Sequence, residues 1–386
     1  MNNKKINILF LIDTYKDGGG TETHLAYLVK YLDKNKFNLI ICAFDLEECP
    51  FVQKIRDDGV TVKHIPVGRF YGIKAFIQAF KLLKLIKDYD IDIVQTYHFK
   101  SDTYGVLVAK LSSQVKILSS RRDIGDLKKP RHILLNRLIN PFIDKFIMVC
   151  DAVGKACSKN ERIPQRKMVT IYNGVDTGRI KPELNDNIHR WKNEAGIDKD
   201  TFVIGSLAYF RPEKAYHVFF QGVEKIRSEI KNFHVLILGD GPLRNQFEAY
   251  CKDRKLTNNV TFLGSIVDVP KYIALMDVIC LVPTGNEGFS NAILEGMAMG
   301  KPIIASNIGG NVESIVDGET GIIIPPNDSE SLSKAILKLY HDPYIRNKMG
   351  EMGRKRTEEC FTVEKMIKRM ERLYVQISMS NKKNRP

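Results

Sequence analysis

The sequence predicts an α/β protein with two domains, each a parallel sheet covered by helices on both faces. The length of 386 residues corresponds to about two domains of ~100–200 residues. Apolar runs such as Val278–Val282 do not alternate with polar residues, which is typical of parallel strands buried on both sides. Strand-like and helix-like patterns follow each other along both halves of the chain, and this order predicts two sheets wound with helices.

The N-terminal half begins with a strand, because the apolar run after Lys4 and Lys5 is too short for a secretion signal and ends at Asp13. The expected strands are Ile6–Ile12, Phe37–Phe44, Val60–Ile65, Asp92–Thr96, Lys116–Ser119, Phe146–Cys150 and Val169–Tyr172. Helical periodicity covers Thr21–Asp33, Ile73–Lys87 and Val106–Leu111. The polar stretch Thr177–Lys199 predicts the domain boundary, with one domain over 1–178 and the second over 179–364.

The C-terminal half repeats the strand and helix order without a solenoid-type repeat. Its expected strands are Phe202–Ser206, His234–Leu238, Val260–Gly264, Val278–Val282, Pro302–Ala305 and Gly321–Ile324. Helices are expected over Val218–Ile230, from near Phe289, over Leu332–Tyr340 and over Val363–Ile377. Residues 365–386 form a C-terminal helix and polar tail that we expect to return to the N-terminal domain.

Two glutamates dominate the candidate site. Glu287 follows a buried strand, at the edge where open α/β sheets bind ligands. Glu295 lies in an almost wholly apolar helical segment, so we expect it to be buried and to need hydrogen-bond donors. A carboxylate accepts two hydroxyl protons, and the adjacent helix start offers N–H groups to a diphosphate. The alternative is structural, with Glu287 capping a helix and Glu295 paired to a buried Lys or Arg.

The stretch Glu-Gly-Phe-Ser-Asn-Ala-Ile-Leu-Glu at 287–295 resembles the Glu-x7-Glu motif of family-4 retaining glycosyltransferases. The resemblance implies the GT-B fold, which is two facing Rossmann-like domains with a deep interdomain cleft. It implies that Glu287 contacts the donor sugar and that Glu295 holds the ribose of a nucleotide, with Gly288, Phe289 and Ser290 beside them. Asn173-Gly-Val-Asp and Gly239-Asp-Gly-Pro are similar to family motifs as well.

Cations and glycines complete the expected donor site. In the family a Lys in the turn after the first strand of the second domain, with an Arg five residues earlier, holds the diphosphate. Lys214 matches, but Tyr209 occupies the Arg position, and Arg211 is a candidate to replace that charge. The loop at 18–20 resembles the family's first glycine loop, which borders the diphosphate through Gly19 and Gly20; a plain tight turn is the alternative. Gly241 and Val267 are the remaining donor candidates, Val267 in the loop that resembles the base pocket.

The acceptor candidates lie in the N-terminal half. His98 follows a strand and is either a ligand residue or a packed histidine. Arg121 and Arg122 stand where many family members carry a His, and either could serve an anionic acceptor or the diphosphate.

The net charge of +14 permits anionic ligands, anionic lipid surfaces or nucleic acid as partners. No nucleic-acid motif is present and the cations are spread along the chain, so we expect no nucleic acid. The segment 128–139 predicts a basic amphipathic helix that binds anionic vesicles, or else an ordinary surface helix. Seven cysteines without metal spacing predict reduced thiols in the cytoplasm, and any membrane contact is expected to be peripheral, on the inner face of the cell membrane.

The combined expectation is a retaining hexosyltransferase that moves a sugar from a nucleotide-sugar donor to a hydroxyl of a glycan or lipid-linked acceptor. UDP is the nucleotide favoured by the resemblance, with GDP as its rival, and surface polysaccharide, lipopolysaccharide or glycolipid synthesis is the expected context. Lys214, Glu287 and Arg211 are the expected catalytic residues, and no metal is expected because the Lys and Arg would neutralise the diphosphate. The alternatives are a nucleotide-sugar epimerase on the same fold and a non-enzymatic basic binding protein; the absence of Gly-x-Gly-x-x-Gly disfavours a dehydrogenase.

Overall fold

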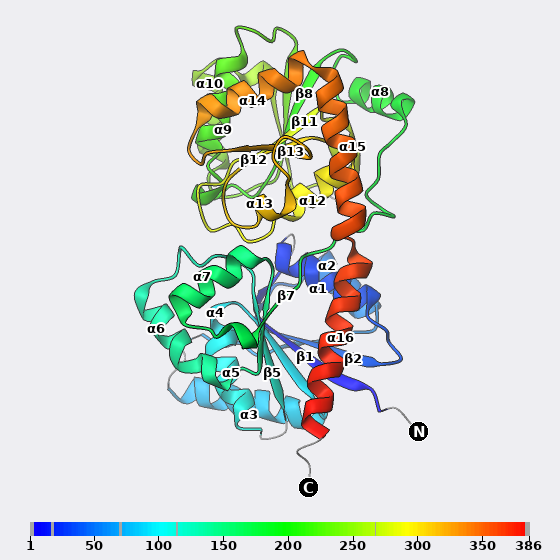
Figure 1. Ribbon diagram of the computed structural model, residues 1–386. Helices are drawn as coiled ribbons and strands as arrows, with labels where there is room; N and C mark the ends of the chain where they lie inside the picture. The colour runs from blue at the N-terminus through cyan, green and yellow to red at the C-terminus, as the bar shows by residue number, and fades with distance from the viewer. Residues whose placement is uncertain (1–3, 17–18, 69–71, 113–114, 267, 383–386) are drawn as a thin grey trace. The chain divides into compact units, whose positions relative to one another are not determined.

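In the computed structural model the chain divides into two compact units (Figure 1), which are considered separately. The structure describes residues 4–16, 19–68, 72–112, 115–266 and 268–382. Unit 1 comprises Met1–Asn173 and Glu364–Pro386, and unit 2 comprises Gly174–Val363. All seven cysteines are free thiols. Among the described helices, none is long and apolar enough to cross a membrane.

Unit 1 is built on a seven-stranded parallel sheet in the order β3-β2-β1-β4-β5-β6-β7. Its interior strand β1 is buried without interruption from Ile8 to Ile12, as expected for a strand covered on both faces. The strands are β1 (Ile6–Tyr15), β2 (Phe37–Leu46), β3 (Thr61–His64), β4 (Ile93–Tyr97), β5 (Lys116–Arg121), β6 (Lys145–Met148) and β7 (Met168–Thr170).

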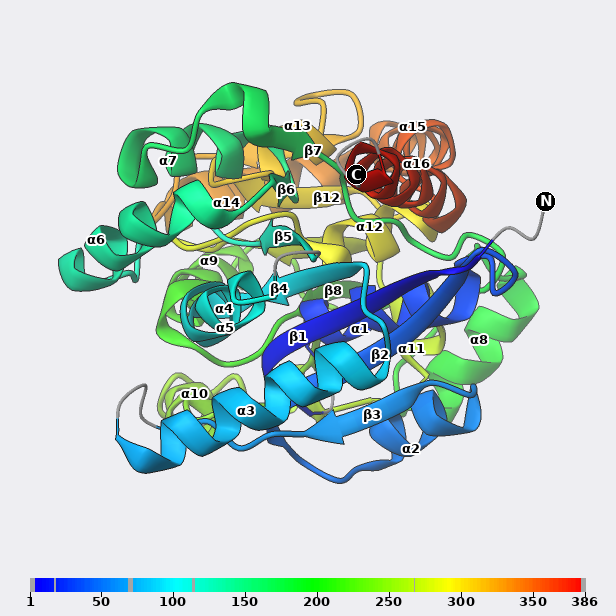
Figure 2. The same cartoon turned by 90° about the horizontal axis from the view of Figure 1, so that it is seen from below.

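Helices cover both faces of this sheet. Figures 1 and 2 show α3, α5, α6 and α7 on one side and α1, α2 and α16 on the other. This division follows from right-handed crossovers, because the chain winds from β1 toward β3 and then returns to β4 and β7. The helices are α1 (Gly20–Tyr31), α2 (Pro50–Asp57), α3 (Ile73–Asp88), α4 (His98–Lys100), α5 (Val106–Lys110), α6 (Pro130–Ile139), α7 (Asp151–Glu161) and α16 (Val363–Lys382), with a π turn at Ser101–Gly105 and 3-10 turns at Asn140–Phe142 and Gln165–Lys167.

Unit 2 is built on a six-stranded parallel sheet in the order β10-β9-β8-β11-β12-β13. The strands are β8 (Phe202–Leu207), β9 (Phe233–Leu238), β10 (Val260–Gly264), β11 (Val278–Leu281), β12 (Ile303–Ser306) and β13 (Gly321–Ile324). The helices are α8 (Asn185–Glu194), α9 (Tyr216–Ile226), α10 (Arg244–Asp253), α11 (Val269–Leu275), α12 (Asn291–Ala298), α13 (Asn311–Ser314), α14 (Ser329–His341) and α15 (Pro343–Cys360), with 3-10 turns at Pro212–Lys214 and Thr257–Asn259.

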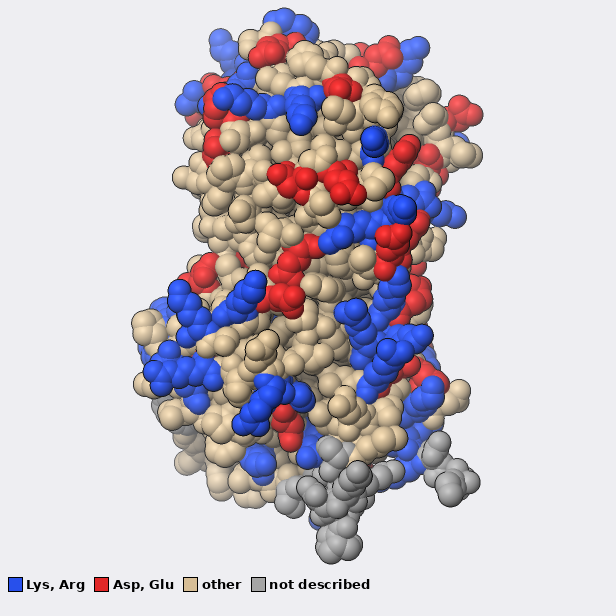
Figure 3. All heavy atoms as spheres, in the orientation of Figure 1, with Lys and Arg blue, Asp and Glu red and all other residues tan. Residues whose placement is uncertain are grey.

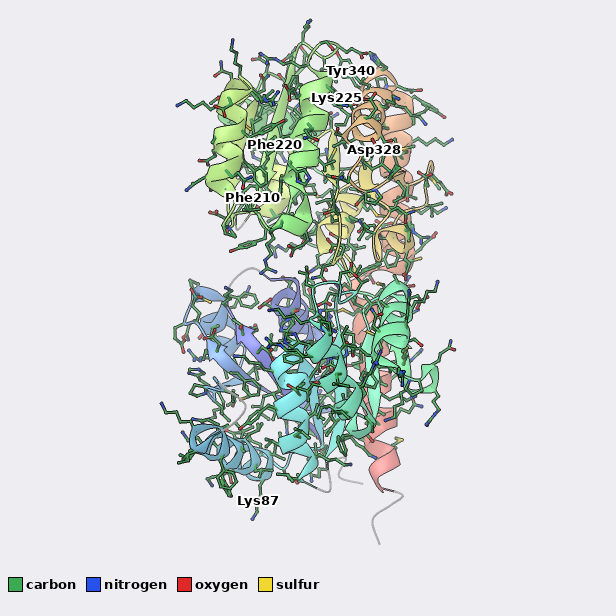
Figure 4. The ribbon with its side chains drawn as sticks, turned by 90° about the vertical axis from the view of Figure 1, so that its left-hand side faces the viewer. Lys87, Phe210, Phe220, Lys225, Asp328 and Tyr340 are labelled. Atoms are coloured by element: carbon green, nitrogen blue, oxygen red, sulfur yellow. The ribbon has the colours of Figure 1, made fainter. Side chains whose placement is uncertain are left out.

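An aromatic cluster fills the core of unit 2 on the side of α9 and α10. Phe210 and Phe220, which Figure 4 labels inside this unit, are fully buried. The ring of Phe210 lies 4.6 Å from that of Tyr216, and Phe220 lies 5.7 Å from Phe247. Because Phe210 lies three residues after the end of β8, this packing anchors the start of the loop that carries Arg211 and Lys214.

The α/β architecture and each predicted strand are confirmed, whereas several helices were not predicted. Helices α8 and α15 are missing from the sequence-based account because they are polar and α15 contains two glycines. The helix expected from near Phe289 begins at Asn291, and α16 extends to Lys382. The polar tail expected after this helix therefore begins within it, and residues 383–386 lie outside the described part of the chain.

Of the two glycines of α15, Gly350 allows close packing on the loop after α12. A Cβ at Gly350 would lie 1.9 Å from the carbonyl oxygen of Gly300, a backbone atom that cannot easily move. A Cβ at Gly353 would lie 3.4 Å from its nearest neighbours, which is ordinary contact. A helix interior normally disfavours glycine, so close approach is the reason for Gly350.

Replacing Gly350 with Ala should therefore destabilise unit 2 by about 1–3 kcal/mol, the usual cost of overpacking. The matched variant Gly353→Ala should stay within about 1 kcal/mol of the wild type, on the stabilising side, because alanine favours helix. Urea unfolding of both variants measures the difference, and equal midpoints would refute the close-packing argument.

Candidate active site

The candidate donor site lies where neighbouring strands of unit 2 wind in opposite directions. From β8 the chain turns toward β9 and β10 on one side, whereas β11 and β12 lie on the other side of β8. Loops at the carboxyl ends of β8 and β11 therefore diverge, and such a switch point is where open α/β sheets bind ligands. Lys214 follows β8, and Glu287 follows β11.

Lys214 and Glu287 meet across this switch point. The Lys214 Nζ donates to the Glu287 Oε2 at 2.5 Å. The Lys214 side chain is 27% exposed and that of Glu287 is 12% exposed, so the pair is shielded but reachable from solvent. Lys214 is thus held by an ion pair and is not freely solvated. Glu287 makes this ion pair rather than capping α12, whose N-cap residue is Ser290.

Backbone hydrogen bonds connect the four loops around this pair. The N–H of Thr284 donates to Glu213 O at 2.9 Å, and the N–H of Gly310 donates to Gly288 O at 2.6 Å. A Cβ at Gly309 would lie 2.0 Å from Glu287 O, so only glycine permits this approach. The loops after β8, β11 and β12 therefore hold the backbone around Lys214 and Glu287 in place.

Gly241 lies in the fourth loop, after β9. A Cβ on Gly241 would lie 2.7 Å from Phe210 N, and the N–H of Phe210 donates to Asp240 O at 2.8 Å. Gly241 thus brings the loops after β8 and β9 together. Val267, the predicted contact to the nucleotide base, lies outside the described residues.

Glu295 lies on α12, between the apolar side chains that anchor this helix. Ile293, Leu294 and Met297 are fully buried, whereas Glu295 is partly exposed and so is less buried than the apolar segment predicts. Its carboxylate has no hydrogen bond or ion pair among the described residues. Desolvation by its surroundings raises the pKa of Glu295 from 4.5 to about 7, and the charge of Arg179 opposes this only in part. Glu295 is therefore a carboxylate that lacks the protein donors it would need.

The remaining candidates for donor binding differ in how accessible their side chains are. Arg211 is exposed, and its guanidinium lies 5.1 Å from the ring centre of Tyr209, the residue at the family's Arg position. Ser290 is partly exposed at the start of α12. Phe289 is buried against Phe361, with ring centres 5.3 Å apart, so its side chain belongs to the core.

A second polar cluster lies at the switch point of unit 1, between β1 and β4. The carboxylate of Asp13 accepts the N–H groups of Lys100 and Ser101 at 2.6 Å each. His98, between them and β4, has the left-handed backbone conformation (φ 72°), and its Nε2 lies 3.2 Å from the Thr21 hydroxyl. His98 is therefore positioned by its neighbours at the strand end rather than packed in the core.

Glu22 belongs to this cluster and was missed by the sequence-based prediction. It is buried in the first turn of α1, and its carboxylate lies over Gly19, where a Cβ would be 1.8 Å from Oε2. Burial raises the pKa of Glu22, and the charges of His98 and Arg122 oppose this. Because Gly19 has no side chain, the carboxylate of Glu22 can lie against its backbone. Gly20 is exposed at the start of α1. The Glu beside the glycines in Gly-Gly-Thr-Glu was the available signal.

The two arginines after β5 have different environments. Arg121 is 5% exposed and pairs with Asp102 and, at 3.1 Å, with Glu161. Arg122 donates to the Asn173 side chain at 2.6 Å, and burial lowers the pKa of Arg122. Arg121 is therefore held by structural ion pairs, whereas Arg122 lies near Glu22 and is the arginine left for a ligand.

Two family models match the chain in succession. The model described as "Glycosyltransferase Family 4" covers residues 18–179, and "Glycosyl transferases group 1" covers residues 187–356. The chain belongs to the family-4 glycosyltransferases, and its fold is GT-B. It is therefore a glycosyltransferase.

Relatives match most of the chain at low identity. The O-antigen chain mannosyltransferase C of Escherichia coli is 28% identical over 77% of this chain and 78% of its own length. An Escherichia coli enzyme named UDP-Gal:alpha-D-GlcNAc-diphosphoundecaprenol alpha-1,3-galactosyltransferase is 26% identical over 83% of this chain and 84% of its own. The crystal structure of Anabaena HepE in complex with UDP aligns with a TM-score of 0.85 at 20% identity, over 96% of this chain and 100% of that chain; this similarity shows the fold alone.

Replacing Arg121 with Met should destabilise unit 1 by about 3–5 kcal/mol, because Asp102 would be left buried without a cation and Glu161 would keep only Lys128. Arg122→Met removes a single charged hydrogen bond to Asn173 and should cost no more than about 2 kcal/mol. Thermal and urea unfolding of the two variants test this difference, and a larger loss for Arg122→Met would contradict the assignment.

Glu295 should also make stability depend on pH. Between pH 4.5 and about 7 the folded protein keeps a proton on Glu295 that the unfolded chain has released, so this group lowers stability as pH rises through that range. The wild type should lose about 1–3 kcal/mol relative to Glu295→Gln, since the partly exposed carboxylate keeps some hydration. Parallel unfolding curves for the two proteins from pH 4 to 8 would show that the carboxylate is not perturbed.

Proposed function

We propose that the protein transfers a sugar from a UDP-sugar to a hydroxyl of a glycan or lipid-linked acceptor, with retention of configuration at the anomeric carbon. The ion pair between Lys214 and Glu287 at the switch point of unit 2 carries this proposal. The names of relatives that act on UDP-Gal and on O-antigen chains support it, as does the UDP bound to Anabaena HepE. They favour a role in surface polysaccharide or lipopolysaccharide synthesis.

In this proposal the bound donor replaces the ion pair between Lys214 and Glu287 with its own contacts to these two residues. Before binding, Lys214 and Glu287 neutralise each other at 2.5 Å. A diphosphate would take the ammonium of Lys214 and the guanidinium of Arg211, which both belong to the turn after β8. The sugar hydroxyls would then donate to Glu287, and the ribose hydroxyls to Glu295, whose carboxylate lacks protein donors. Ionisation of Glu295 favours such a contact.

The proposed reaction takes place on one face of the sugar. The bond between the anomeric carbon and the diphosphate oxygen breaks while the acceptor oxygen bonds to the same carbon from the same side. The acceptor proton passes to an oxygen of the departing diphosphate. Lys214 and Arg211 stabilise the negative charge that grows on this leaving group. We include no metal ion in the proposal, since these two cations supply the charge that a metal would.

Unit 1 holds the acceptor in the proposal. His98 and Arg122 lie at the carboxyl edge of its sheet, and Glu22 adds an acceptor for hydroxyl protons. This combination of a carboxylate, an imidazole and a guanidinium suits a ligand that carries hydroxyls and an anionic group.

UDP should raise the melting temperature of the protein in the presence of EDTA. A ligand at a hundred times its Kd stabilises the folded state by about 2.7 kcal/mol, which corresponds to several degrees at roughly 2–4 °C per kcal/mol. GDP, ADP, CMP and NAD serve as comparisons. A shift with GDP alone would change the donor, and no shift with any nucleotide would refute the donor site.

Lys214→Ala should reduce sugar transfer roughly 100- to 1,000-fold, the usual cost of removing one group that stabilises developing charge. The matched control is Lys225→Ala, because Lys225 forms an ion pair with Glu330 at 2.6 Å on the surface of the same unit. The control should keep full activity, and the NMR coupling constant of the product's anomeric proton should report retention. Equal activity of both variants, or an inverted product, would contradict the mechanism.

A further inference from the structure

Helix α3 carries apolar side chains on its solvent side as well as on its core side. Ile73, Phe76, Ile77 and Phe80, here named the α3 stripe, are 81%, 65%, 47% and 58% exposed. Their i, i+3, i+4, i+7 spacing places them on one face of the helix. The buried residues Ala75, Leu82, Leu85 and Ile86 form the opposite face. Core packing therefore does not explain the stripe.

The α3 stripe is part of a larger apolar surface. Of the sixteen large hydrophobic residues that are exposed in the described part of the chain, ten lie between residues 73 and 142. They belong to α3, α5, α6 and the segments next to these helices, which cover one side of the unit 1 sheet (Figures 1 and 2). Besides the α3 stripe they are Leu107, Leu111, Leu127, Leu134, Leu138 and Phe142. Clustering of this kind marks an interaction surface rather than scattered exposure.

The same surface is positively charged. Helix α3 contains Lys74, Lys81, Lys84 and Lys87 against one acidic residue, Asp88. Lys84 and Lys87 continue the line of the α3 stripe along the helix, and Figure 4 shows Lys87 projecting from its end. On α6, Arg131 and Arg137 accompany the exposed leucines.

The charge of the whole chain resides in unit 1. Unit 1 has 36 Lys and Arg against 20 Asp and Glu, a net charge of +16, whereas unit 2 has 23 against 25, a net charge of −2. Figure 3 shows the blue side chains that gather over unit 1. An anionic partner would therefore be drawn to unit 1 and not to unit 2.

We propose that the outer face of α3, α5 and α6 docks on an anionic lipid bilayer, with the α3 stripe entering the interface. A helix with bulky apolar residues on one face and lysines beside them lies in the plane of a bilayer surface, and its lysines extend to the lipid phosphates. A second copy of the chain fits this face less well, since a two-fold contact would bring two positive surfaces together. The prediction of vesicle binding from sequence concerned α6 alone, whereas the α3 stripe is the larger apolar element.

Flotation of the full-length protein with vesicles tests the proposal. The wild type should bind vesicles that contain phosphatidylglycerol and phosphatidylcholine, and bind pure phosphatidylcholine vesicles at least tenfold more weakly. The double variant Phe76→Ser, Phe80→Ser should lose at least tenfold in partitioning to anionic vesicles. Lys81→Gln should lose about fivefold, because each lysine near the surface contributes about that factor.

The matched control changes two equally exposed apolar residues of unit 2, Leu184 and Tyr344, to Ser. This variant should bind anionic vesicles as the wild type does. Because all four positions are exposed, both double variants should keep the wild-type melting temperature. The UDP-induced shift should be retained as well, so vesicle binding and donor binding are tested separately.

Tryptophan fluorescence locates the contact. The chain has a single tryptophan, Trp191 on α8 of unit 2. In anionic vesicles with brominated phosphatidylcholine, Phe80→Trp should add a quenched signal, whereas Tyr31→Trp on α1, at the other side of the unit 1 sheet, should not.

Three results would overturn the proposal. One is equal binding of the wild type and the Phe76→Ser, Phe80→Ser variant to anionic vesicles. Another is a wild type that floats with neither vesicle. The third is a dimer in light scattering that this variant abolishes without any change in flotation, which would assign the α3 stripe to a contact between copies.

Discussion

Parallel pairing of every strand is the constraint on which the rest of this structure depends. A parallel strand must be followed by a crossover before the next one can pair, so all the strands of a sheet end at the same edge. Both units reverse their winding once, between β8 and β11 and between β1 and β4. At these two places the loops diverge, and open α/β sheets bind ligands where the strand order reverses. The polar residues of both candidate sites lie at these two places.

Electrostatics distinguishes the two sites. In unit 2 the charges of Lys214 and Glu287 cancel, and Glu295 is a carboxylate whose surroundings disfavour its charge. In unit 1 the carboxylates of Asp13 and Glu22 have raised pKa values because of burial, although backbone N–H groups and nearby cations act against the shift. Each site thus holds acidic groups that are costly to ionise without a donor of hydrogen bonds, and a ligand rich in hydroxyls meets that need.

The strands and the family could be predicted from the sequence. Features that depend on tertiary packing could not. Apolar runs identify β1 and β11 because a strand buried on both faces needs apolar side chains at successive positions. Helix α15 was not predicted because glycine at position 350 suggests the end of a helix. In the structure Gly350 instead permits close contact with Gly300. Adjacent arginines 121 and 122 cannot be told apart by sequence, since only the fold shows which one meets Asp102. The same periodicity describes both faces of α3, so sequence alone did not show that one of them is exposed.

Helix α16 gives the chain an unusual order of folding. It joins unit 1 although 190 residues of unit 2 precede it, and the Tyr374 hydroxyl donates to Gln95 across a separation of 279 residues. Tyr374 and Met370 are fully buried in unit 1. Unit 2 is one continuous segment, and at ~5–20 residues per second its synthesis takes about 10–40 s. The core of unit 1 therefore lacks the side chains of α16 for that time. The domain that the ribosome begins first is therefore the one completed last, and its unfinished core is exposed to chaperones throughout that interval.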